Sequence, residues 1–372
     1  MKVLLLIDSL GSGGAQRQLC LLARELKRAG WNVELLVYHS ALDHFGPLLA
    51  AAEIPVIRLQ KQTRFSLRTP VAIAWHALTG GYQAMLAFLP TPTVYGAIAR
   101  AAGGPPLLVS ERFSFQGSKP DRASWVVAQF QRLAAVVVCN SRHHGARFTA
   151  AFPWLRSRTC VVYNGAELTP AQPLTTGARP LRLLAIGTVT PRKNFATVIE
   201  ALGCLRAHGL PVPQVRWAGK VGLEPAERAA RAQAERRLVE LDLASHWEWL
   251  GERTDIPTLL GECDALIHAS FLEGFPNAMG EAFAAGRPVL ASAVGDHALL
   301  VREGENGFLF DPAAAESIAA AMVRAQQLER GALQEMGRRA RAVAETQLSV
   351  SAMTRHYARL LRAAGGTEEA VL

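Results

Sequence analysis

Residues 273–286 read EGFPNAMGEAFAAG, and this stretch says more about the fold than any other part of the 372-residue chain. Glu273 and Glu281 lie eight positions apart, with a Gly-Phe-Pro-Asn turn between them. Pro276 suits the first turn of a helix, where a missing N–H group is not needed, and Asn277 is an alternative cap. We therefore predict a loop that carries Glu273 and a short helix that carries Glu281.

The segments on either side extend this unit to strand, loop, helix and strand. Gly286 is typical of the residue just past a helix end, and Pro288 prevents continuation. Residues 265–269 and 288–292 are apolar and strand-like. In a parallel sheet this arrangement places both glutamates at the carboxyl edge, where ligands bind. The start of the short helix would also attract a phosphate or a polarised hydroxyl, because its N–H groups are free.

The same alternation of short apolar runs with amphipathic segments fills the rest of the chain. Helical spacing of apolar residues predicts helices over residues 16–29 and 349–363, and residues 223–242 read as a long charged helix. The expected strands span residues 3–7, 33–37, 56–59, 84–89, 107–110, 136–140, 161–163, 181–186, 215–218, 247–250, 265–269 and 289–291. Such alternation indicates α/β architecture with doubly wound parallel sheets.

The chain is long enough for two hydrophobic cores. The Pro-rich polar stretch 169–180 reads as a linker between an N-terminal domain, residues 1–168, and a second domain, residues 181–348. Residues 69–99 contain no charged side chain, but prolines and glycines interrupt them, so we expect a helix, a strand and a loop rather than a membrane span.

Two glycine turns follow predicted strands. Gly13 and Gly14 come after the first strand, but a dinucleotide fingerprint would need glycine at position 16, where Gln stands. A Rossmann oxidoreductase is therefore disfavoured. Gly187 follows the strand at residues 181–186 and precedes Arg192 and Lys193, which supply the positive charge that a buried diphosphate requires.

These motifs together resemble the retaining family-4, or group 1, glycosyltransferases. That family has the GT-B fold, in which two Rossmann-like parallel-sheet domains face a cleft. The resemblance covers most of the chain and rests on the paired glutamates, Gly13-Gly14-Ala15, Asn164-Gly165, Arg192-Lys193-Asn194 and residues 305–309. It implies that the N-terminal domain binds the acceptor, that the second domain binds the donor, and that the helix at residues 349–366 packs back on the N-terminal domain.

The resemblance also implies roles for single residues. Lys193 and Arg192 would hold the diphosphate of a nucleoside-diphosphate sugar, for which we expect UDP rather than GDP, and Glu281 would bind the ribose. Glu273 would face the donor sugar and act in catalysis with the two cations. The remaining donor contacts would come from Gly13, Gly14, Gly187, Gly274, Phe275, Pro276 and Asn277. Many relatives carry arginine directly after the glycine of the basic loop, where this chain has Thr188.

The acceptor side is less distinct in the sequence. Some family members place a histidine after the strand that corresponds to residues 107–110, whereas this chain has Glu111 and Arg112. These two side chains would bind polar groups of a glycan or a lipid-linked glycan, or pair with each other.

No metal or cofactor is expected. The chain has no Asp-x-Asp, no His/Cys cluster has metal-ligand spacing, and the adjacent His143 and His144 read as surface residues. The five scattered cysteines indicate buried thiols and a cytosolic compartment. The absence of Asp-x-Asp suggests metal independence, and the family resemblance implies transfer with retention of anomeric configuration, which is a hypothesis.

Charge is divided unevenly between the halves. Residues 1–165 hold 18 Lys and Arg against 7 Asp and Glu, whereas residues 166–372 hold 22 against 24. A basic first half favours an anionic partner, and we expect peripheral binding to the inner face of the cell membrane rather than to nucleic acid, for which no motif is present. The basic and apolar residues that indicate an interfacial segment are Lys61, Arg64, Phe65, Leu67, Arg68, Arg122, Trp125 and Arg132.

Two alternatives stay open at this point. One is another GT-B enzyme, a sugar-nucleotide epimerase or a phosphorylase. The other is a non-catalytic scaffold that binds nucleotide sugars or membranes.

Overall fold

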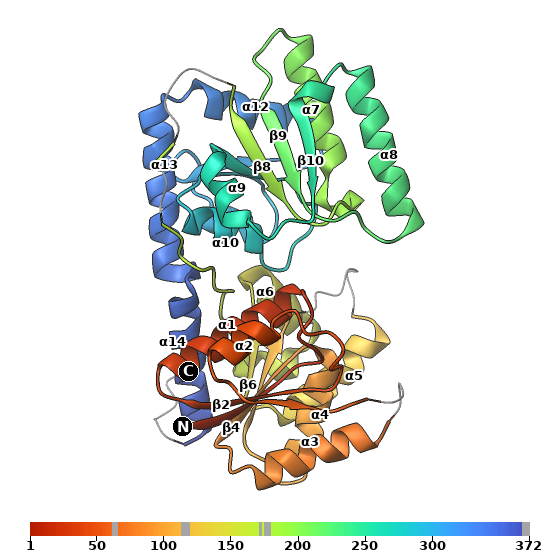
Figure 1. The fold of residues 1–372 in the computed structure, drawn as a ribbon, viewed down its shortest axis with the longest axis vertical. Coiled ribbons are helices and arrows are strands. Elements are labelled where there is room, and N and C mark those ends of the chain that lie inside the picture. The colour runs from red at the N-terminus through yellow and green to blue at the C-terminus, as the bar shows by residue number, and fades with distance from the viewer. Residues whose placement is uncertain (62–65, 113–119, 171–172, 175–179, 367–372) are drawn as a thin grey trace. The chain divides into compact units, whose positions relative to one another are not determined.

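The computed structural model describes residues 1–61, 66–112, 120–170, 173–174 and 180–366. It divides into two compact units (Figure 1). Unit 1 comprises Met1–Gly165 together with the C-terminal segment that begins at Val350, and unit 2 comprises Ala166–Ser349. Arg64 and Phe65 of the expected interfacial segment, and most of the expected linker, lie outside the described residues. None of the described helices is both long and apolar enough to cross a membrane.

Unit 1 is built on a parallel sheet of seven strands in the order β3-β2-β1-β4-β5-β6-β7. The strands are β1 (Lys2–Leu6), β2 (Asn32–Val37), β3 (Val56–Arg58), β4 (Ala84–Phe88), β5 (Leu107–Glu111), β6 (Val136–Cys139) and β7 (Thr159–Val161). The helices are α1 (Gly14–Arg28), α2 (Gly46–Ala51), α3 (Arg68–Thr79), α4 (Pro90–Ala101), α5 (Arg122–Phe130), α6 (Arg142–Ala151) and α14 (Val350–Ala364), with the short 3-10 helices η1 (Gln131–Leu133) and η2 (Pro153–Arg158).

Alternation along the strands of unit 1 produces two cores, one on each side of the sheet. In β1, Val3 and Leu5 point into one core, which α1 and α14 cover, and Leu4 and Leu6 point into the other, beneath α3 and α4. α14 is amphipathic and packs along α1, with Tyr357 fully buried. Strands buried on both faces are typical of doubly wound sheets.

Unit 2 has a parallel sheet of six strands in the order β10-β9-β8-β11-β12-β13. The strands are β8 (Arg182–Ile186), β9 (Gln214–Ala218), β10 (Trp247–Gly251), β11 (Ala265–His268), β12 (Val289–Ser292) and β13 (Gly307–Phe310). The helices are α7 (Phe195–Ala207), α8 (Pro225–Glu240), α9 (Ile256–Glu262), α10 (Asn277–Ala284), α11 (His297–Leu300), α12 (Ala315–Gln327) and α13 (Arg330–Val343), with the short helices η3 (Pro191–Lys193), η4 (Ala244–His246) and η5 (Ala344–Leu348).

The fold class predicted from the sequence is confirmed, because both sheets are wholly parallel and interleaved with helices. Three local predictions are wrong. Residues 90–101 form α4 rather than a loop, because Pro90 and Pro92 occupy its first turn, where proline is tolerated. β13 was not predicted as a strand. His144 is 2% exposed rather than a surface residue, because Ser141 caps α6 and turns this histidine inward.

Candidate functional site

The strand order of unit 2 marks one edge of its sheet as a binding position. β8 lies at the middle of the sheet, with β9 and β10 added on one side and β11, β12 and β13 on the other. The strand order therefore reverses between β8 and β11, and open α/β sheets bind ligands at the carboxyl ends of the strands at such a point. The loop after β8 carries Gly187, Arg192 and Lys193, and the loop after β11 carries Glu273.

The loop after β8 depends on a glycine. Gly187 has φ +150°, and a Cβ added there would lie 2.9 Å from Cε of Lys193. The backbone of Gly187 is also held from outside the loop, since its carbonyl accepts a hydrogen bond of 2.8 Å from Nε1 of Trp217. The absence of a side chain at position 187 thus lets the Lys193 chain pass directly over the backbone.

A buried asparagine fixes the far end of this loop. Asn194 is in the left-handed conformation, φ +63°, and is 2% exposed. Its Nδ2 donates to the carbonyl oxygens of Ala269, at 3.1 Å, and Pro312, at 2.8 Å, while its Oδ1 accepts from Thr197. Asparagine tolerates this backbone conformation, and its amide ties the basic loop to the end of β11.

The two loops meet at a carboxylate with two cations. Nζ of Lys193 lies 2.6 Å from Oε1 of Glu273, and Nη1 of Arg192 lies 3.7 Å from the other carboxylate oxygen. Arg192 also donates to the carbonyl of Leu272 at 2.9 Å. The side chains of Lys193 and Glu273 are mostly buried, whereas that of Arg192 is 48% exposed. The structure therefore brings the three residues predicted for catalysis into one cluster.

The electrostatics of the cluster favour an ionised Glu273 carboxylate and leave the cluster with a net positive charge. Burial by itself would raise the pKa of Glu273, but the adjacent Lys193 outweighs it and lowers the pKa to about 2. Two cations then face one anion, which leaves an excess of one positive charge at the strand ends. Such a site suits a polyanionic group.

A pair of buried histidines lies behind Glu273. His268 ends β11 with Nε2 3.8 Å from Oε1 of Glu273, and its ring meets that of His297 edge to face at 4.8 Å. Burial lowers the pKa of both imidazoles, and that of His268 falls well below its ordinary value, so both are neutral at pH 7. Nδ1 of His297 lies 2.8 Å from the carbonyl of Ser292 and carries its proton toward it.

Sequence reasoning missed His297 and its contact with His268, which lies in the predicted strand at residues 265–269. The available signal was a histidine inside an otherwise apolar predicted strand, since a polar side chain there must be buried. Its partner lies 29 positions further along the chain, so no spacing rule connects the two.

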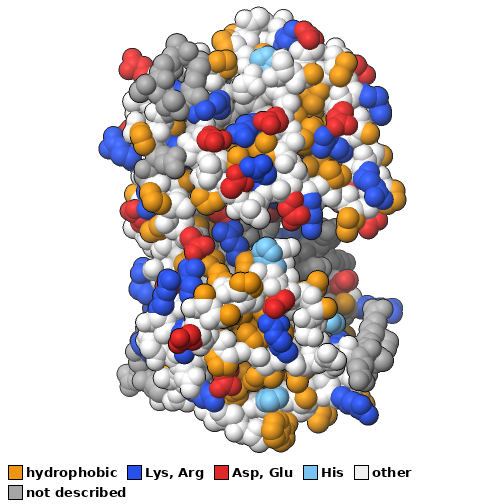
Figure 2. All heavy atoms as spheres, viewed as in Figure 1, with side chains coloured by type: hydrophobic (Ala, Val, Ile, Leu, Met, Phe, Trp, Pro, Cys, Tyr) orange, Lys and Arg blue, Asp and Glu red, His pale blue; other side chains and the backbone are white. Residues whose placement is uncertain are grey.

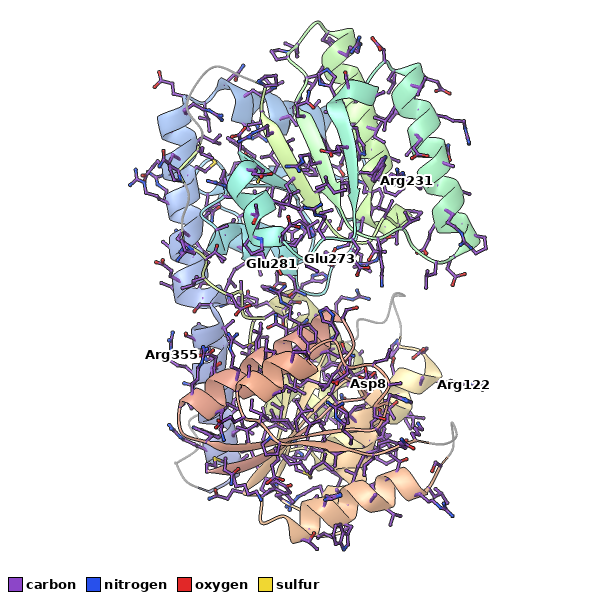
Figure 3. All side chains as sticks on the ribbon, viewed as in Figure 1. Asp8, Arg122, Arg231, Glu273, Glu281 and Arg355 are labelled. Carbon is purple, nitrogen blue, oxygen red and sulfur yellow. The ribbon has the colours of Figure 1, made fainter. Side chains whose placement is uncertain are left out.

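α10 holds the second glutamate of the motif. The helix begins at Asn277, one residue later than predicted, and Pro276 is its capping residue rather than part of its first turn. Gly286 follows the helix with φ +69°, as predicted. Glu281 is partly exposed on α10, and Glu273 and Glu281 lie at the same end of the sheet in Figure 3. Gly274 is partly exposed and Phe275 is buried in the turn between them.

Unit 1 carries the other predicted residues. Gly13 caps α1 and Gly14 is its first residue, directly after β1. The turn is fixed by Gln16, whose Nε2 donates to Oδ1 of Asp8 at 2.9 Å. β1 and β4 are neighbours with strands added on both sides, so this turn lies at the equivalent switch point of the first sheet.

Glu111 ends β5 and Arg112 directly follows it, and each of the two side chains contacts other residues. Oε2 of Glu111 accepts from Nε2 of Gln131 at 2.7 Å. Arg112 donates to Ser110 at 2.9 Å and to Asn164 at 2.7 Å. The Glu111 carboxylate lines a pocket of about 220 Å³ that is otherwise largely apolar, whereas the Arg112 guanidinium stacks on Phe88, 4.0 Å from the ring centre.

Comparison with known families decides the relationship. Residues 12–169 match the model of glycosyltransferase family 4, and residues 180–327 match that of the glycosyl transferases group 1. The chain belongs to the group 1, family-4 glycosyltransferases. The two matches correspond to the two units, and together they cover most of this glycosyltransferase.

Curated relatives are distant. The chain is 25% identical over 217 residues, 56% of its own length and 52% of the relative's, to the putative colanic acid biosynthesis glycosyltransferase WcaL of Escherichia coli K12. It is 26% identical over 220 residues, 54% of its length and 47% of the relative's, to the D-inositol 3-phosphate glycosyltransferase of Streptomyces avermitilis. The chain thus spans about half the length of the curated relatives it matches.

Solved structures share the fold of this glycosyltransferase over nearly its whole length. Anabaena Alr3699/HepE in complex with UDP has a TM-score of 0.83 at 23% identity and covers 98% of this chain and 100% of its own. The lipopolysaccharide outer core galactosyltransferase WaaB, in its apo form, has a TM-score of 0.73 at 15% identity, with 96% and 98% covered. These likenesses establish the GT-B fold.

Proposed function

We propose that this glycosyltransferase transfers a sugar from a UDP-sugar to a hydroxyl of a glycan or lipid-linked glycan, with retention of anomeric configuration and without a metal ion. It would work at the cytoplasmic face of the cell membrane. The observation that carries the proposal is the cluster of Lys193, Arg192 and Glu273 at the switch point of the second sheet.

The excess positive charge of this cluster supports a diphosphate ligand. Hydrogen bonds to charged groups contribute roughly 1.5–3 kcal/mol each, so two cations can stabilise a leaving diphosphate substantially. The choice of UDP is supported by Anabaena HepE, which has been solved with UDP and with UDP-glucose.

Each remaining donor residue has a proposed part. Glu281 would accept hydrogen bonds from the ribose hydroxyls. Glu273 would orient Lys193 and accept from hydroxyls of the donor sugar. The backbone of Gly274 and Asn277, with that of Phe275 and Pro276, would line the sugar and the distal phosphate. Gly187 leaves room above the strand end for the phosphates.

The proposed reaction needs no nucleophile from the enzyme. The acceptor oxygen attacks the anomeric carbon from the face that the diphosphate leaves, so a new C–O bond forms as the bond to the phosphate oxygen breaks. The acceptor proton passes to that phosphate oxygen, and UDP departs. Lys193 and Arg192 stabilise the charge that develops on the diphosphate.

On the acceptor side, Glu111 and Arg112 are proposed to bind polar groups of the acceptor, and Gly13 and Gly14 would let the acceptor and donor approach the backbone closely. A glycan acceptor is supported by the relative WcaL, whose name assigns it to colanic acid biosynthesis.

The test begins with the donor. A panel of UDP-, GDP- and ADP-sugars is scored by thermal shift, because a ligand that binds only the folded state raises the unfolding temperature. The best donor is then incubated with glycan and lipid-linked acceptors in the presence of EDTA, and proton NMR of the product reports the anomeric configuration. We expect transfer that persists in EDTA, with the donor configuration retained.

Three results would contradict the proposal. Inverted product would exclude the retaining reaction, and loss of turnover in EDTA that added magnesium restores would exclude metal independence. Conversion of donor without acceptor, or consumption of inorganic phosphate, would indicate an epimerase or a phosphorylase instead.

A further inference from the structure

The exposed apolar side chains of unit 1 gather on one side of its sheet. They lie on α3 or directly before it and on α4, α5, η1 and η2, which cover the same core, with α4 packed between α3 and α5. Among the described residues, Leu42 is the exception, and the opposite helices α1, α2 and α14 contribute none. The set is Leu67, Val71, Trp75, Leu78, Ile98, Trp125, Val126, Leu133 and Trp154.

α3 is the most unusual of these elements, because it is apolar on two faces. Its inner face includes Ile73 and Ala77, which are buried. Val71, Trp75 and Leu78 follow one another at helical spacing on the outer face and are 66%, 59% and 49% exposed. A helix that is apolar all round belongs in a core or in a lipid environment rather than in water. Figure 2 shows hydrophobic side chains at the surface where α3 lies.

The charge around this stripe is mainly positive. Residues 54–166 hold thirteen Lys and Arg but two Asp and Glu. Of the two acids, Glu111 is buried and Asp121 caps α5 by accepting from the Ser124 amide. Glu34 of β2 lies on the same side of the sheet, but it pairs with Lys2 and accepts a hydrogen bond from Tyr82, so positive charge is in excess on the face that carries α3 and α5.

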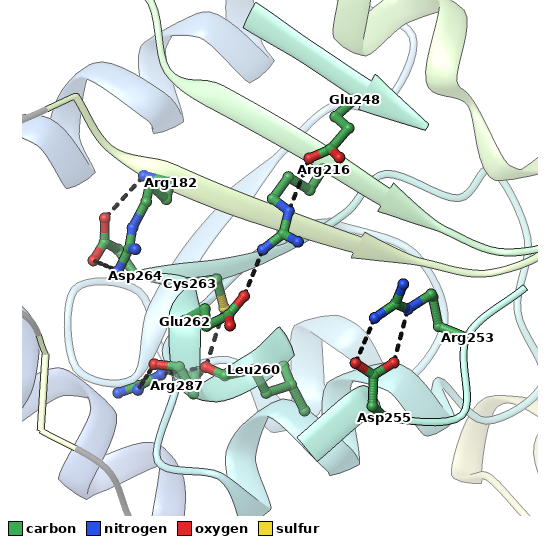
Figure 4. A network of polar contacts seen from close by, with 11 residues as sticks. Arg182, Arg216, Glu248, Arg253, Asp255, Leu260, Glu262, Cys263, Asp264 and Arg287 are labelled. Atoms are coloured by element: carbon green, nitrogen blue, oxygen red, sulfur yellow. Dashed lines mark hydrogen bonds and ion pairs between the residues drawn. The ribbon is translucent and has the colours of Figure 1, made fainter. Parts of the chain in front are cut away.

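Several basic side chains on this face form no ion pair with a described acid. No acid within the described ranges forms an ion pair with any of four exposed arginines, Arg68, Arg122, Arg132 and Arg156. In unit 2 many arginines pair with acids, as Figure 4 shows for Arg182 with Asp264, Arg216 with Glu248 and Glu262, and Arg253 with Asp255. Unpaired arginines beside tryptophan and aliphatic side chains match the composition of helices that lie in a membrane interface.

We propose that the outer face of α3 and α5 docks on an anionic phospholipid bilayer. Val71, Trp75 and Leu78 enter the boundary between headgroups and acyl chains, while Arg68 and Arg122 bind lipid phosphates. A second copy of the chain fits this face poorly, because docking would oppose two surfaces of the same charge. The inference deepens the proposed function by locating the surface that holds the enzyme at the membrane, and it can be tested without any glycosyl transfer.

The experiment measures flotation of the full-length protein with vesicles of phosphatidylglycerol and phosphatidylethanolamine, and with vesicles of phosphatidylcholine alone. We expect binding to the anionic vesicles that weakens at high ionic strength, because exposed charges are screened. The double variant Val71→Ser with Trp75→Ser should bind at least tenfold more weakly. Its control is Val239→Ser on α8 of unit 2, where the side chain is 70% exposed, and this variant should bind as the wild type does.

A second pair of variants tests the charges. Arg68→Gln with Arg122→Gln should weaken binding to anionic vesicles by roughly tenfold and flatten its dependence on salt. Arg206→Gln is the control, since this exposed arginine already pairs with Asp242. Thermal unfolding midpoints of all variants verify that they are folded.

The outcomes separate this inference from the proposed function. Flotation that is unaffected by the Val71 and Trp75 changes, or that is independent of anionic lipid, overturns the docking surface. A dimer in light scattering that these same changes convert to a monomer also overturns it, in favour of self-association. Variants that lose flotation but transfer sugar to a water-soluble acceptor analogue at the wild-type rate support it. If the wild type floats as expected but no donor supports transfer, the proposed function fails and the docking surface stands.

Discussion

Lys193 and Glu273 are eighty residues apart in the sequence, yet Nζ of the lysine lies 2.6 Å from a carboxylate oxygen of the glutamate. This contact joins the loops that follow two adjacent parallel strands, β8 and β11. It also keeps a cation mostly buried at the point where the strand order reverses. A lysine in this position can hold an anionic ligand because its own charge is fixed and oriented before the ligand arrives.

Replacing Lys193 should therefore impair donor use. Lys193→Met removes one charged hydrogen bond to the diphosphate, roughly 1.5–3 kcal/mol, so we expect kcat/KM for the donor to fall by about ten- to a hundredfold. Arg206→Met removes an exposed cation elsewhere in unit 2 and should leave kcat/KM within about twofold of wild type. Steady-state kinetics with the best donor measures both. Equal kcat/KM in wild type and Lys193→Met would contradict the assigned role.

Glu273 predicts a pH dependence of stability. Its pKa is lowered from 4.5 to about 2 in the folded protein, so the stabilising contribution is complete above about 4.5 and is lost as the pH falls toward 2. That shift corresponds to about 3 kcal/mol at most. Glu273→Gln should thus be less stable than wild type near pH 7, and the difference should shrink steadily below pH 4.5.

Urea unfolding of both proteins at a series of pH values measures this difference. A gap between wild type and Glu273→Gln that stays constant from neutral to acid pH would show that the carboxylate is not held in its ionised form by Lys193.

The buried histidines predict a second and separable pH effect. Because the pKa values of His268 and His297 are lowered in the folded state, the unfolded chain binds protons first as the pH falls through the ordinary value of 6.5. Stability should therefore decrease below about pH 6.5, by up to about 1.4 kcal/mol per pH unit for each histidine. His268→Phe should reduce this slope, whereas His208→Gln, at an exposed position, should not.

The slope is obtained from the free energy of unfolding between neutral pH and pH 5, a range in which Glu273 stays ionised. A slope that is the same in wild type and His268→Phe would refute the assignment of acid sensitivity to this imidazole.

Gly187 offers a test of the basic loop itself. A side chain at this position meets Lys193 at 2.9 Å and is also strained by φ +150°. Gly187→Ala should displace the lysine and raise KM for the donor about tenfold or more, in addition to lowering stability by roughly 1 kcal/mol. Gly209→Ala is the matched control, because Gly209 also has positive φ, +65°, but open space around its Cβ position.

Gly209→Ala should lower stability by a similar amount and leave KM unchanged. If both alanine variants lower stability and neither affects KM, then the approach of Lys193 to Gly187 has no part in donor binding.

Much of the fold could be predicted because its signals are local. Apolar runs of four to six residues bounded by glycine and proline mark strands, and each of the strands named in advance is present within a few residues of its expected position. The turn from Glu273 to the helix of Glu281 was predicted for the same reason. β13 was not predicted because it begins with Gly307 and follows charged residues, so its apolar run is short.

α4 and His144 show why other predictions were wrong. Prolines were interpreted as helix breaks. Proline is compatible with a helix when it lies in the first turn, but the sequence does not say which position of a helix a proline takes. Adjacent histidines are read as exposed, but the helix α6 points one outward and the other toward the sheet.

The sequence by itself determined two alternating α/β regions, the glycine turns, the basic loop and the glutamate pair, because hydrophobic period and turn chemistry act over a few residues. Tertiary structure alone decided that Lys193 meets Glu273, that His268 meets His297, and that the outer face of α3 is left uncovered. These contacts and this exposed face depend on which distant segments pack together. The free energy that selects such packing is summed over the whole core, so no single stretch of the chain determines it.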